Sequence, residues 1–486
     1  MKPRRQRRAV MSGFVMLLTL LAACTGQAAP VQLTRQVLTL PAGAGMPIFG
    51  DIDGDGRLDL LVIDQSENKL LSYHQGANGF ASSPDQTMAL PPQTGWVALC
   101  DVDAHPGMEL LMSTATGVFY SRQNGGRFEP ERHTLIEANQ VFTKDSHPIL
   151  ITLNTNNTWT NDMIPVISAG QTVLYRRDAN YVWSPEPPIA LTAKHTGWSV
   201  SREQRRNPWA VGENYAYNLS IQQSYQARPQ DDDQKPENEA IRKIFEDMKK
   251  DSPEADVTMD LMDVDGDGRK DVVLWKVSGK WDFRTDFYIF LRGADGKLPD
   301  RPTQVLHGRG LPIPLGNEFH WSPLGDLNGD GVCELVLLEF KTSATSVSGA
   351  LETALSHGLD WGLTIRSFRH GGFPGSAEAS LPITMILPAE MLQEWPIFIK
   401  GDFNGDGRPD VLTRRTETQW NIFLSTADGQ WFAPQPAITF ETPAQGYMTV
   451  RDLNGDGLAD IFWYEPDDNR ISIFMSPTNL AKGKKP

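Results

Sequence analysis

The chain has 486 residues, enough for two or three average domains or for one large repeat architecture. With 42 Gly, 34 Pro, 21 Phe and 13 Trp, its composition suits turns and short strands better than a helical bundle. Its 60 acidic side chains outnumber 45 basic ones, and the formal charge of −15 argues against a nucleic-acid-binding protein, which needs a basic surface.

The N-terminal residues have the pattern of an export signal. A basic segment at residues 2–8 precedes an apolar run at residues 11–23 that is too short to span a bilayer comfortably. The run ends in Leu21, Ala22, Ala23 and Cys24, which resembles the lipobox of bacterial lipoproteins. The resemblance implies cleavage before Cys24 and acylation of that residue, which would hold the protein on a membrane. The alternative is ordinary signal cleavage with a chance cysteine nearby.

These features predict a lipoprotein signal peptide at residues 1–23 and a tether at residues 24–30, with the protein anchored in the bacterial cell envelope. Thr25 after the acylated cysteine, rather than Asp, favours the outer membrane in a Gram-negative host. The sequence leaves open whether the periplasm or the cell surface is the site of action. The remaining cysteines, Cys100 and Cys333, fall in different repeats, so we predict no disulfide between them.

A nine-residue pattern, D-x-[DN]-x-D-G-x-x-[DE], recurs along the rest of the chain. We call each copy an Asp loop and number its positions 1 to 9. Good copies begin at Asp51, Asp263, Asp326, Asp402 and Asp452, and weaker copies begin at Asp101 and Asn154. A β-type apolar run follows each loop, and in most copies a second apolar strand leads to a turn rich in Gly, Asn or Asp.

Each repeat therefore predicts four strands in about 50 residues, which is the spacing of a propeller blade. The last repeat lacks a fourth strand, and residues 35–41 at the other end of the chain look like one. We predict an all-β, seven-bladed β-propeller at residues 31–480 in which this N-terminal strand closes the last blade and removes two open sheet edges. A basic tail follows at residues 481–486.

By its loops, their spacing and their Gly-bearing turns, the chain resembles the FG-GAP or VCBS repeat family, which includes the calcium-binding blades of integrin α subunits. The resemblance covers essentially everything from Val31 onward. Five loops match the family pattern well, whereas the loops at Asp101 and Asn154 depart from it.

The Asp loops have the donor chemistry of calcium sites. Calcium takes about six to eight oxygens, and each good loop offers side-chain oxygens at positions 1, 3, 5 and 9 and a main-chain carbonyl at position 7. An EF-hand would close at position 12 between helices, whereas strands follow here. Asp-Gly sequences also make simple hairpin turns, but five copies with all four oxygens favour about five calcium ions.

The predicted ligands of the first two good loops are Asp51, Asp53, Asp55, Arg57, Asp59, Asp263, Asp265, Asp267, Arg269 and Asp271. Those of the other three are Asp326, Asn328, Asp330, Val332, Glu334, Asp402, Asn404, Asp406, Arg408, Asp410, Asp452, Asn454, Asp456, Leu458 and Asp460. His105 and Pro106 leave metal binding by the loop at Asp101 open. The loop at Asn154, where Asp162 is the only charged ligand position, is expected to hold no ion.

Two insertions interrupt the repeats, at about residues 193–256 and 342–361. The first predicts a helix at residues 239–250, with Ile241, Phe245 and Met248 on one apolar face. The second predicts a possible helix near residues 350–356. Strand direction places both insertions on the face opposite the Asp loops, where Trp198, Trp209 and Trp361 are candidate partner-binding residues. The alternative is that these tryptophans pack the insertions onto the ring.

The sequence shows no enzyme motif: no zinc-binding histidine spacing, nucleophile elbow, phosphate loop or dinucleotide fingerprint occurs. This is weak evidence, because the carboxylate pairs of glycosidases leave no local signature. The favoured function is a binding module for a protein or polysaccharide. The alternatives are a carbohydrate-active enzyme, such as a glycosidase or lyase with its site on the insertion face, and a scaffold subunit of an envelope assembly.

Overall fold

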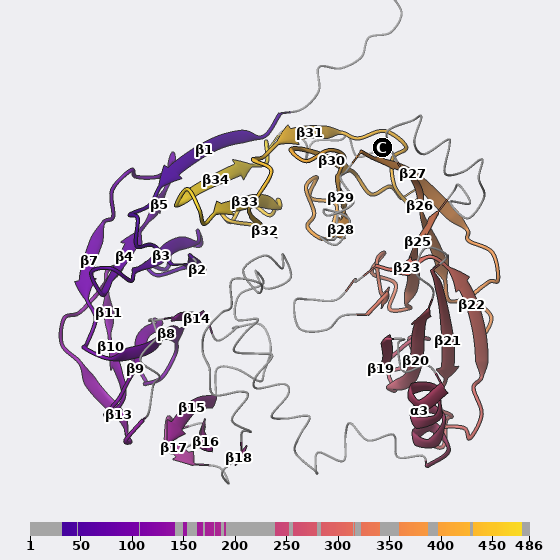
Figure 1. Cartoon of the computed structure of the whole chain (residues 1–486), viewed down its shortest axis with the longest axis horizontal. Helices are drawn as coiled ribbons and strands as arrows, with labels where there is room; N and C mark the ends of the chain where they lie inside the picture. Colours follow the sequence, from indigo (N-terminus) through magenta and orange to yellow (C-terminus); the bar gives the residue numbers. More distant parts are fainter. Residues whose placement is uncertain are drawn as a thin grey trace, which may run out of the picture.

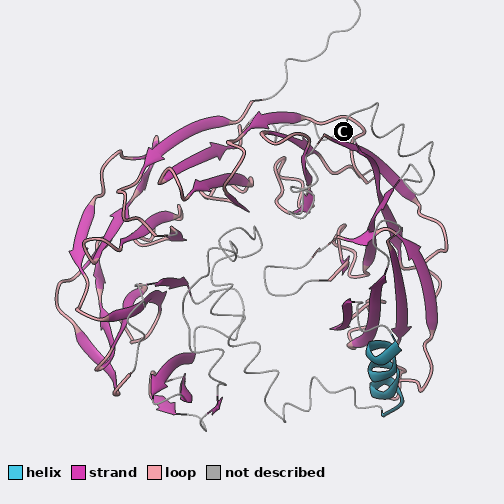
Figure 2. Cartoon of the chain, in the orientation of Figure 1, coloured by secondary structure: helices cyan, strands magenta, loops and turns pink. Residues whose placement is uncertain are grey.

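The fold is known from a computed structural model. It describes residues 32–45, 47–105, 107–140, 149–152, 163–168, 171–178, 180–185, 189–190, 239–251, 256–278, 283–313, 315, 322–340, 359–386, 397–427 and 431–478. The predicted signal peptide, tether, lipidated Cys24, basic tail and Asn154 loop lie outside these residues, as do Trp198, Trp209 and the possible second helix. Within them the chain is all-β, with one helix and with sheets that are antiparallel except at one strand pair (Figure 2).

The described strands form seven sheets of four or five strands, which we number in chain order. Sheet 1 contains β2 (Ile48–Gly50), β3 (Asp59–Asp64), β4 (Lys69–Tyr73) and β7 (Gln86–Ala89). Sheet 2 contains β8 (Thr94–Cys100), β9 (Glu109–Thr114), β10 (Gly117–Ser121), β13 (His133–Glu137) and β14 (Ile149–Thr152). Sheet 3 contains β15 (Met163–Ser168), β16 (Gln171–Arg177), β17 (Trp183–Pro185) and β18 (Ile189–Ala190).

The later repeats supply the other four sheets. Sheet 4 contains β19 (Asp256–Met262), β20 (Asp271–Ser278), β21 (Arg284–Phe290) and β22 (Gln304–Arg309). Sheet 5 contains β23 (Leu311–Pro312), β24 (Leu324–Gly325), β25 (Glu334–Phe340), β26 (Leu359–Ser367) and β27 (Ala379–Met385). Sheet 6 contains β28 (Ile397–Ile399), β29 (Val411–Arg414), β30 (Gln419–Phe423) and β31 (Ile438–Glu441). Sheet 7 contains β32 (Tyr447–Arg451), β33 (Asp460–Glu465), β34 (Arg470–Met475) and β1 (Thr34–Thr39).

The sheets follow one another around a common centre in chain order, and in sheets 1, 4, 5, 6 and 7 the first strand lies inward and the last strand of the sheet order lies outward (Figure 1). Two small ribbons, β5 (Gln75–Gly76) with β6 (Gly79–Phe80) and β11 (Gln123–Asn124) with β12 (Arg127–Phe128), form the Gly turns of the first two repeats.

As predicted, the N-terminal strand completes the last sheet. Strand β1 pairs antiparallel with β34, in a register that runs from Thr34 opposite Met475 to Thr39 opposite Arg470. Figure 1 shows this indigo strand beside the yellow C-terminal sheet. The pairing covers a strand edge that would otherwise expose free backbone donors and acceptors.

The third repeat departs from the regular pattern. Its expected first strand, β14, pairs in parallel with β8 of sheet 2, from Ile149 opposite Trp96 to Thr152 opposite Leu99, and not with β15. Strand β8 is the inner edge of its sheet, so its free backbone groups can accept an additional strand.

The second strand of each sheet explains why apolar runs follow the Asp loops. In β3, Leu60 and Val62 pack into the cluster between sheets 1 and 7, whereas Leu61 and Ile63 pack into the cluster between sheets 1 and 2. Successive side chains point to opposite faces of a strand, and a sheet held between two neighbours buries both faces. Six apolar clusters join successive sheets in this way.

A seventh cluster joins sheet 4 to the helix of the first insertion. Helix α3 (Glu239–Asp251) matches the predicted helix, and its Ile241 and Met248 are buried as expected. They pack with Val272 and Leu274 of β20. In Figure 1 the helix lies against the side of sheet 4 that faces away from sheet 5. The insertion helix therefore covers one face of sheet 4, whereas in sheets 1, 2, 5, 6 and 7 both faces pack against neighbouring sheets.

Candidate metal-binding loops

The five good Asp loops share one local structure. In the first, the carboxylate of Asp51 accepts hydrogen bonds from the backbone N–H groups of Gly54 at 2.8 Å and Gly56 at 3.0 Å. The other four repeat these two contacts. The glycines at positions 4 and 6 have φ between 73° and 85° in every good loop. Only glycine adopts this left-handed conformation at little cost, so both glycines are needed to wrap the loop around position 1.

The position-9 carboxylate ties each loop to its sheet. Asp410 is fully buried, and its two oxygens accept backbone hydrogen bonds from Phe403 and Ser425, both at 2.7 Å. Burial raises the pKa of Asp410 to about 7, against the lowering effect of these hydrogen bonds. Burial likewise raises the pKa of Asp460 and Glu334 to about 7, and it raises the pKa of Asp59 and Asp271.

The oxygens of two loops lie close enough together for one cation. Carboxylate oxygens of Asp51, Asp53 and Asp59 lie within 4.8 Å of one another. Those of Asp263, Asp265 and Asp267 do the same. Oxygens on opposite sides of a calcium ion, each at about 2.4 Å, are about 4.8 Å apart, so both donor sets fit calcium.

The other three good loops carry Asn at position 3. In each, the Asn side-chain nitrogen donates to the position-5 carboxylate, over 3.1 Å in the loop at Asp326 and 3.2 Å in the loops at Asp402 and Asp452. The amide oxygen of that Asn is a neutral ligand atom of the kind that calcium accepts. At position 7, the side chains of Arg57 and Arg269 pair with Asp55 and Asp267, so only their main-chain carbonyls suit the predicted ligand role.

Neighbouring Asp loops are bonded to one another. At three junctions the backbone N–H of position 8 donates to a carbonyl of the preceding sheet's loop. The pairs are Leu58 with Leu453 at 2.8 Å, Cys333 with Val264 at 3.0 Å and Ala459 with Asp402 at 2.7 Å. These bonds make the loops part of the contacts between sheets, so an ion that stiffens one loop also supports its neighbour.

A second recurring contact, which the sequence reasoning missed, joins successive sheets at the outer strands. Gln36 of β1 donates through Nε2 to the carbonyl of Phe80 at 2.6 Å and accepts from the Phe80 N–H at 3.0 Å. The same pair of bonds links Gln86 to Phe128 and Gln304 to Phe373. We call this contact the Gln–Phe clamp. Its signal in the sequence is a Gln two residues before a buried Leu or Met at the start of a fourth strand.

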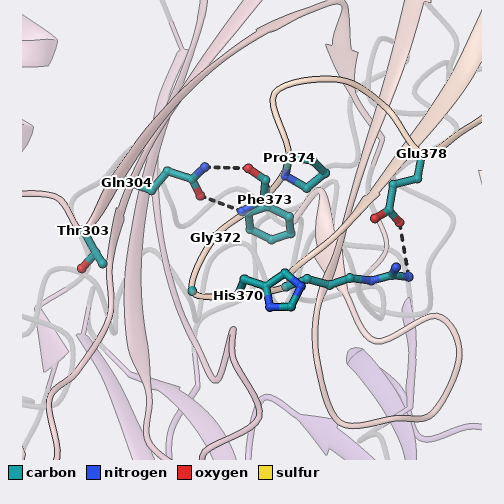
Figure 3. A pocket seen from close by; sticks show the side chains of 9 residues that line it. Thr303, Gln304, His370, Gly372, Phe373, Pro374 and Glu378 are labelled. Carbon is teal, nitrogen blue, oxygen red and sulfur yellow. Dashed lines mark hydrogen bonds and ion pairs between the residues drawn. The ribbon is translucent and has the colours of Figure 1, made fainter.

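One of these clamps borders an open pocket (Figure 3). The pocket is lined by Thr303 and Gln304 of sheet 4 and by the turn between β26 and β27, including Phe373. Among the described residues that line it, Glu378 is the only carboxylate, and it pairs with Arg369 at 3.5 Å. A glycosidase needs two carboxylates that flank the substrate, so this pocket gives no support to that alternative.

One predicted partner-binding residue lies in the core. Trp361 is 5% exposed and packs between sheets 5 and 6 with Ile397 and Phe423. The sequence placed it at the end of the second insertion, but β26 already begins at Leu359. The prediction of Trp361 as a surface anchor is wrong, because it stands inside a strand that is packed on both faces.

The described part of the chain also contains two cysteines and one helix. Cys100 and Cys333 are both buried, and burial raises the pKa of the Cys333 thiol to about 12. None of the described helical residues forms a span long and apolar enough to cross a membrane.

Comparison with known families agrees with the reading of the loops. Residues 402–463, which include the good loops at Asp402 and Asp452, match the FG-GAP-like repeat. The chain therefore carries an FG-GAP-like repeat, as its Asp loops predicted. A search of curated proteins finds no match.

Two solved structures align with most of the chain. The crystal structure of BBS1N in complex with ARL6DN, soaked with lead, is 7% identical, with a TM-score of 0.32, and the alignment covers 92% of this chain and 97% of that one. The crystal structure of the exotype rhamnogalacturonan lyase YesX is 12% identical, with a TM-score of 0.25, and the alignment covers 92% of this chain and 75% of that one. Neither likeness is close enough to carry an argument about function.

Proposed function

We propose that the chain is a calcium-stabilised, seven-bladed β-propeller of the bacterial cell envelope, anchored through lipidated Cys24, that acts as a binding module for a protein or polysaccharide. The observation that carries this proposal is the shared geometry of the five good Asp loops. Each folds two left-handed glycines around a position-1 carboxylate, and neighbouring loops are bonded across the sheets. In this proposal each of the seven sheets is one blade, and the pairing of β1 with β34 supports closure of the ring.

Calcium would be held by the oxygens of positions 1, 3, 5 and 9 and by the main-chain carbonyl of position 7. The bound ion supplies the positive charge that clustered carboxylates require. The protein's own contribution is to fix position 9 by two backbone hydrogen bonds and to join adjacent loops through position 8. The result is a stiff ring that presents the connections opposite the loops to a ligand.

Calcium binding is tested by elemental analysis and calcium titration of the purified chain. We expect about five ions, and Asp402→Ala or Asp452→Ala should each remove about one by loss of a ligand oxygen. Asp467→Ala, an exposed aspartate outside the loops, is the matched control and should remove none. Chelation should lower the melting temperature. A calcium-free protein whose melting is insensitive to chelator would contradict the proposal.

The anchor and the binding role need separate experiments. Mass spectrometry of the exported protein should find acyl groups on Cys24, and Cys24→Ser should release the protein from the membrane. A glycan array together with pull-down from envelope extracts, both with the calcium-loaded chain, should identify a polysaccharide or protein ligand. Turnover of an array glycan in place of retention would favour the enzyme alternative.

A further inference from the structure

The Asp loop of the second repeat differs from the good loops at the two positions that shape the turn. Residues 101–109 carry Ala104 and Pro106 where the good loops have glycine. In the good loops the position-6 N–H donates to the position-1 carboxylate over 2.6 to 3.0 Å. Proline has no N–H, and its ring fixes φ near about −65°. Asp101 therefore cannot receive the hydrogen bond that closes the other loops.

Two side chains from the region of sheet 3 contact the carboxylate oxygen Oδ2 of Asp101 instead. The Tyr181 hydroxyl donates to Asp101 Oδ2 at 3.3 Å, and Arg177 Nη1 lies 3.4 Å from the same oxygen. Arg177 also donates to the Asp101 carbonyl at 2.7 Å, and its guanidinium lies 4.4 Å from the centre of the Tyr181 ring. The Arg177 side chain is 14% exposed and that of Asp101 is 40% exposed, so the arginine is largely buried while the carboxylate is still open to solvent on one side.

A second arginine neutralises position 3. Arg122, which follows β10, donates to Asp103 Oδ2 through Nε at 2.9 Å and lies 2.8 Å from it through Nη2. Burial tends to raise the pKa of Asp103, but hydrogen bonds from the His105 N–H and from Arg122 lower it below its usual value. Both carboxylates that a calcium ion would need at positions 1 and 3 are therefore already paired with guanidinium groups.

The arginines of the good loops are placed differently. Arg57 is residue 7 of its own loop and pairs with Asp55 at position 5, and Arg269 pairs with Asp267 in the same way. Positions 1, 3 and 9 of the first loop still bring their oxygens within 4.8 Å of one another. In the second repeat, by contrast, the Arg177 guanidinium comes from sheet 3 and pairs with Asp101 at position 1.

We propose that the second Asp loop is closed by Arg122 and Arg177 in place of calcium, and that it serves as a metal-independent docking site for sheet 3. Trp183 supports this docking, since its Nε1 donates to the carbonyl of Val102, the next residue of the loop, at 3.3 Å. The contrast with the calcium-binding loops depends on the proposed function, but the contacts of Arg177 and Tyr181 do not.

Amide hydrogen exchange of the full chain, in calcium and in chelator, tests the metal-independence. Chelation should speed exchange at the good loops, while residues 101–105 keep their protection. Arg177→Met should speed exchange at residues 101–105 by about tenfold or more in both buffers, because a charge-assisted contact is lost. Arg132→Met, which changes an exposed arginine directly before β13 of sheet 2, is the control and should change nothing there. If Arg177→Met prevents folding, Tyr181→Phe supplies the same measurement with a smaller effect.

The exchange data separate two failures. Good loops that are unaffected by chelator would refute the calcium proposal and leave the arginine contact to be judged by its variants. Loss of protection at residues 101–105 on chelation, or no response to Arg177→Met and Tyr181→Phe, would overturn the present inference.

Restoring the loop gives an independent test through metal stoichiometry. A variant with a restored loop sequence and without the two arginines that contact it combines five substitutions: Ala104→Gly, His105→Asp, Pro106→Gly, Arg122→Met and Arg177→Met. Terbium luminescence titration of this variant should show about one more bound ion than the natural chain. In the natural chain, Asp103→Ala, which removes the ligand oxygens of position 3, should leave the number of bound ions unchanged. A loss of one ion from Asp103→Ala would show that the second loop binds metal and would overturn the inference.

Discussion

The Gln–Phe clamp at Gln36 offers a stringent test of how the chain ends hold the ring together. Gln36→Ala removes the two hydrogen bonds to the backbone of Phe80, a residue that is 5% exposed. Each such bond contributes about 1 kcal/mol net, and leaving a buried backbone group without its partner adds to the loss. We expect the free energy of unfolding to fall by about 2–3 kcal/mol.

The matched variants divide this effect into its causes. Gln36→Glu keeps an acceptor for the Phe80 N–H but loses the donor to the Phe80 carbonyl, so it should destabilise at least as much as Gln36→Ala. Gln86→Ala breaks the same clamp between two sheets that are already joined by the chain, and it should cost less than Gln36→Ala. Gln435→Ala, an exposed glutamine, should fall within about 0.5 kcal/mol of the natural protein.

Urea unfolding followed by tryptophan fluorescence, at saturating calcium, measures these differences. The unfolding midpoint should fall in the order Gln435→Ala, Gln86→Ala, Gln36→Ala. If Gln36→Ala unfolds at the same urea concentration as Gln435→Ala, the clamp does not stabilise the closure and the reasoning is refuted.

Three further predictions follow from the core and the loops. In chelator, the free energy of unfolding should fall as the pH rises from about 4 to about 7. The reason is that the pKa of Asp410 and Asp460 is raised to about 7 in the folded chain, which therefore holds these protons more tightly than the unfolded chain does. Calcium should abolish this loss, and stability that rises with pH in chelator would contradict the prediction. Ile241→Ala should cost about 2–4 kcal/mol in urea unfolding by opening the contact between α3 and sheet 4, whereas the exposed Lys243→Ala should be near neutral. Trp361→Ala should cost about 3–5 kcal/mol and leave ligand retention by the surviving folded fraction intact, whereas lost retention without lost stability would restore its role as a surface anchor.

The loops and the sheets are best regarded as one mechanical system. Position 9 connects four of the five good loops to the end of the third strand of their own sheet, and position 8 connects some loops to the preceding sheet. Calcium would then act on contacts between sheets as well as within a loop. At the junction of sheets 2 and 3, Arg177 connects the second Asp loop to the neighbouring sheet without an ion.

Several features could be predicted from the sequence because their physical cause is local or repeated. The oxygen ligands and paired glycines of the Asp loops occupy fixed positions within nine residues. The apolar face of α3 follows helical spacing, and the strand at residues 35–41 was identified because its pattern matches the fourth strands elsewhere. In each case a short pattern constrains its own backbone, so no knowledge of distant contacts was needed.

Only the tertiary structure decided which distant groups meet. Arg177 reaches Asp101 from another repeat, and Gln36 reaches Phe80 across the junction of the last and first sheets. Trp361 was assigned to a surface insertion because an apolar residue at a strand end looks the same in sequence whether it faces a partner or a neighbouring sheet. The parallel pairing of β14 with β8 has the same origin, since a free strand edge accepts any extended segment that the fold brings beside it. Hydrogen bonds and packing between remote residues depend on where the chain returns in space, and that is settled only when the sheets assemble.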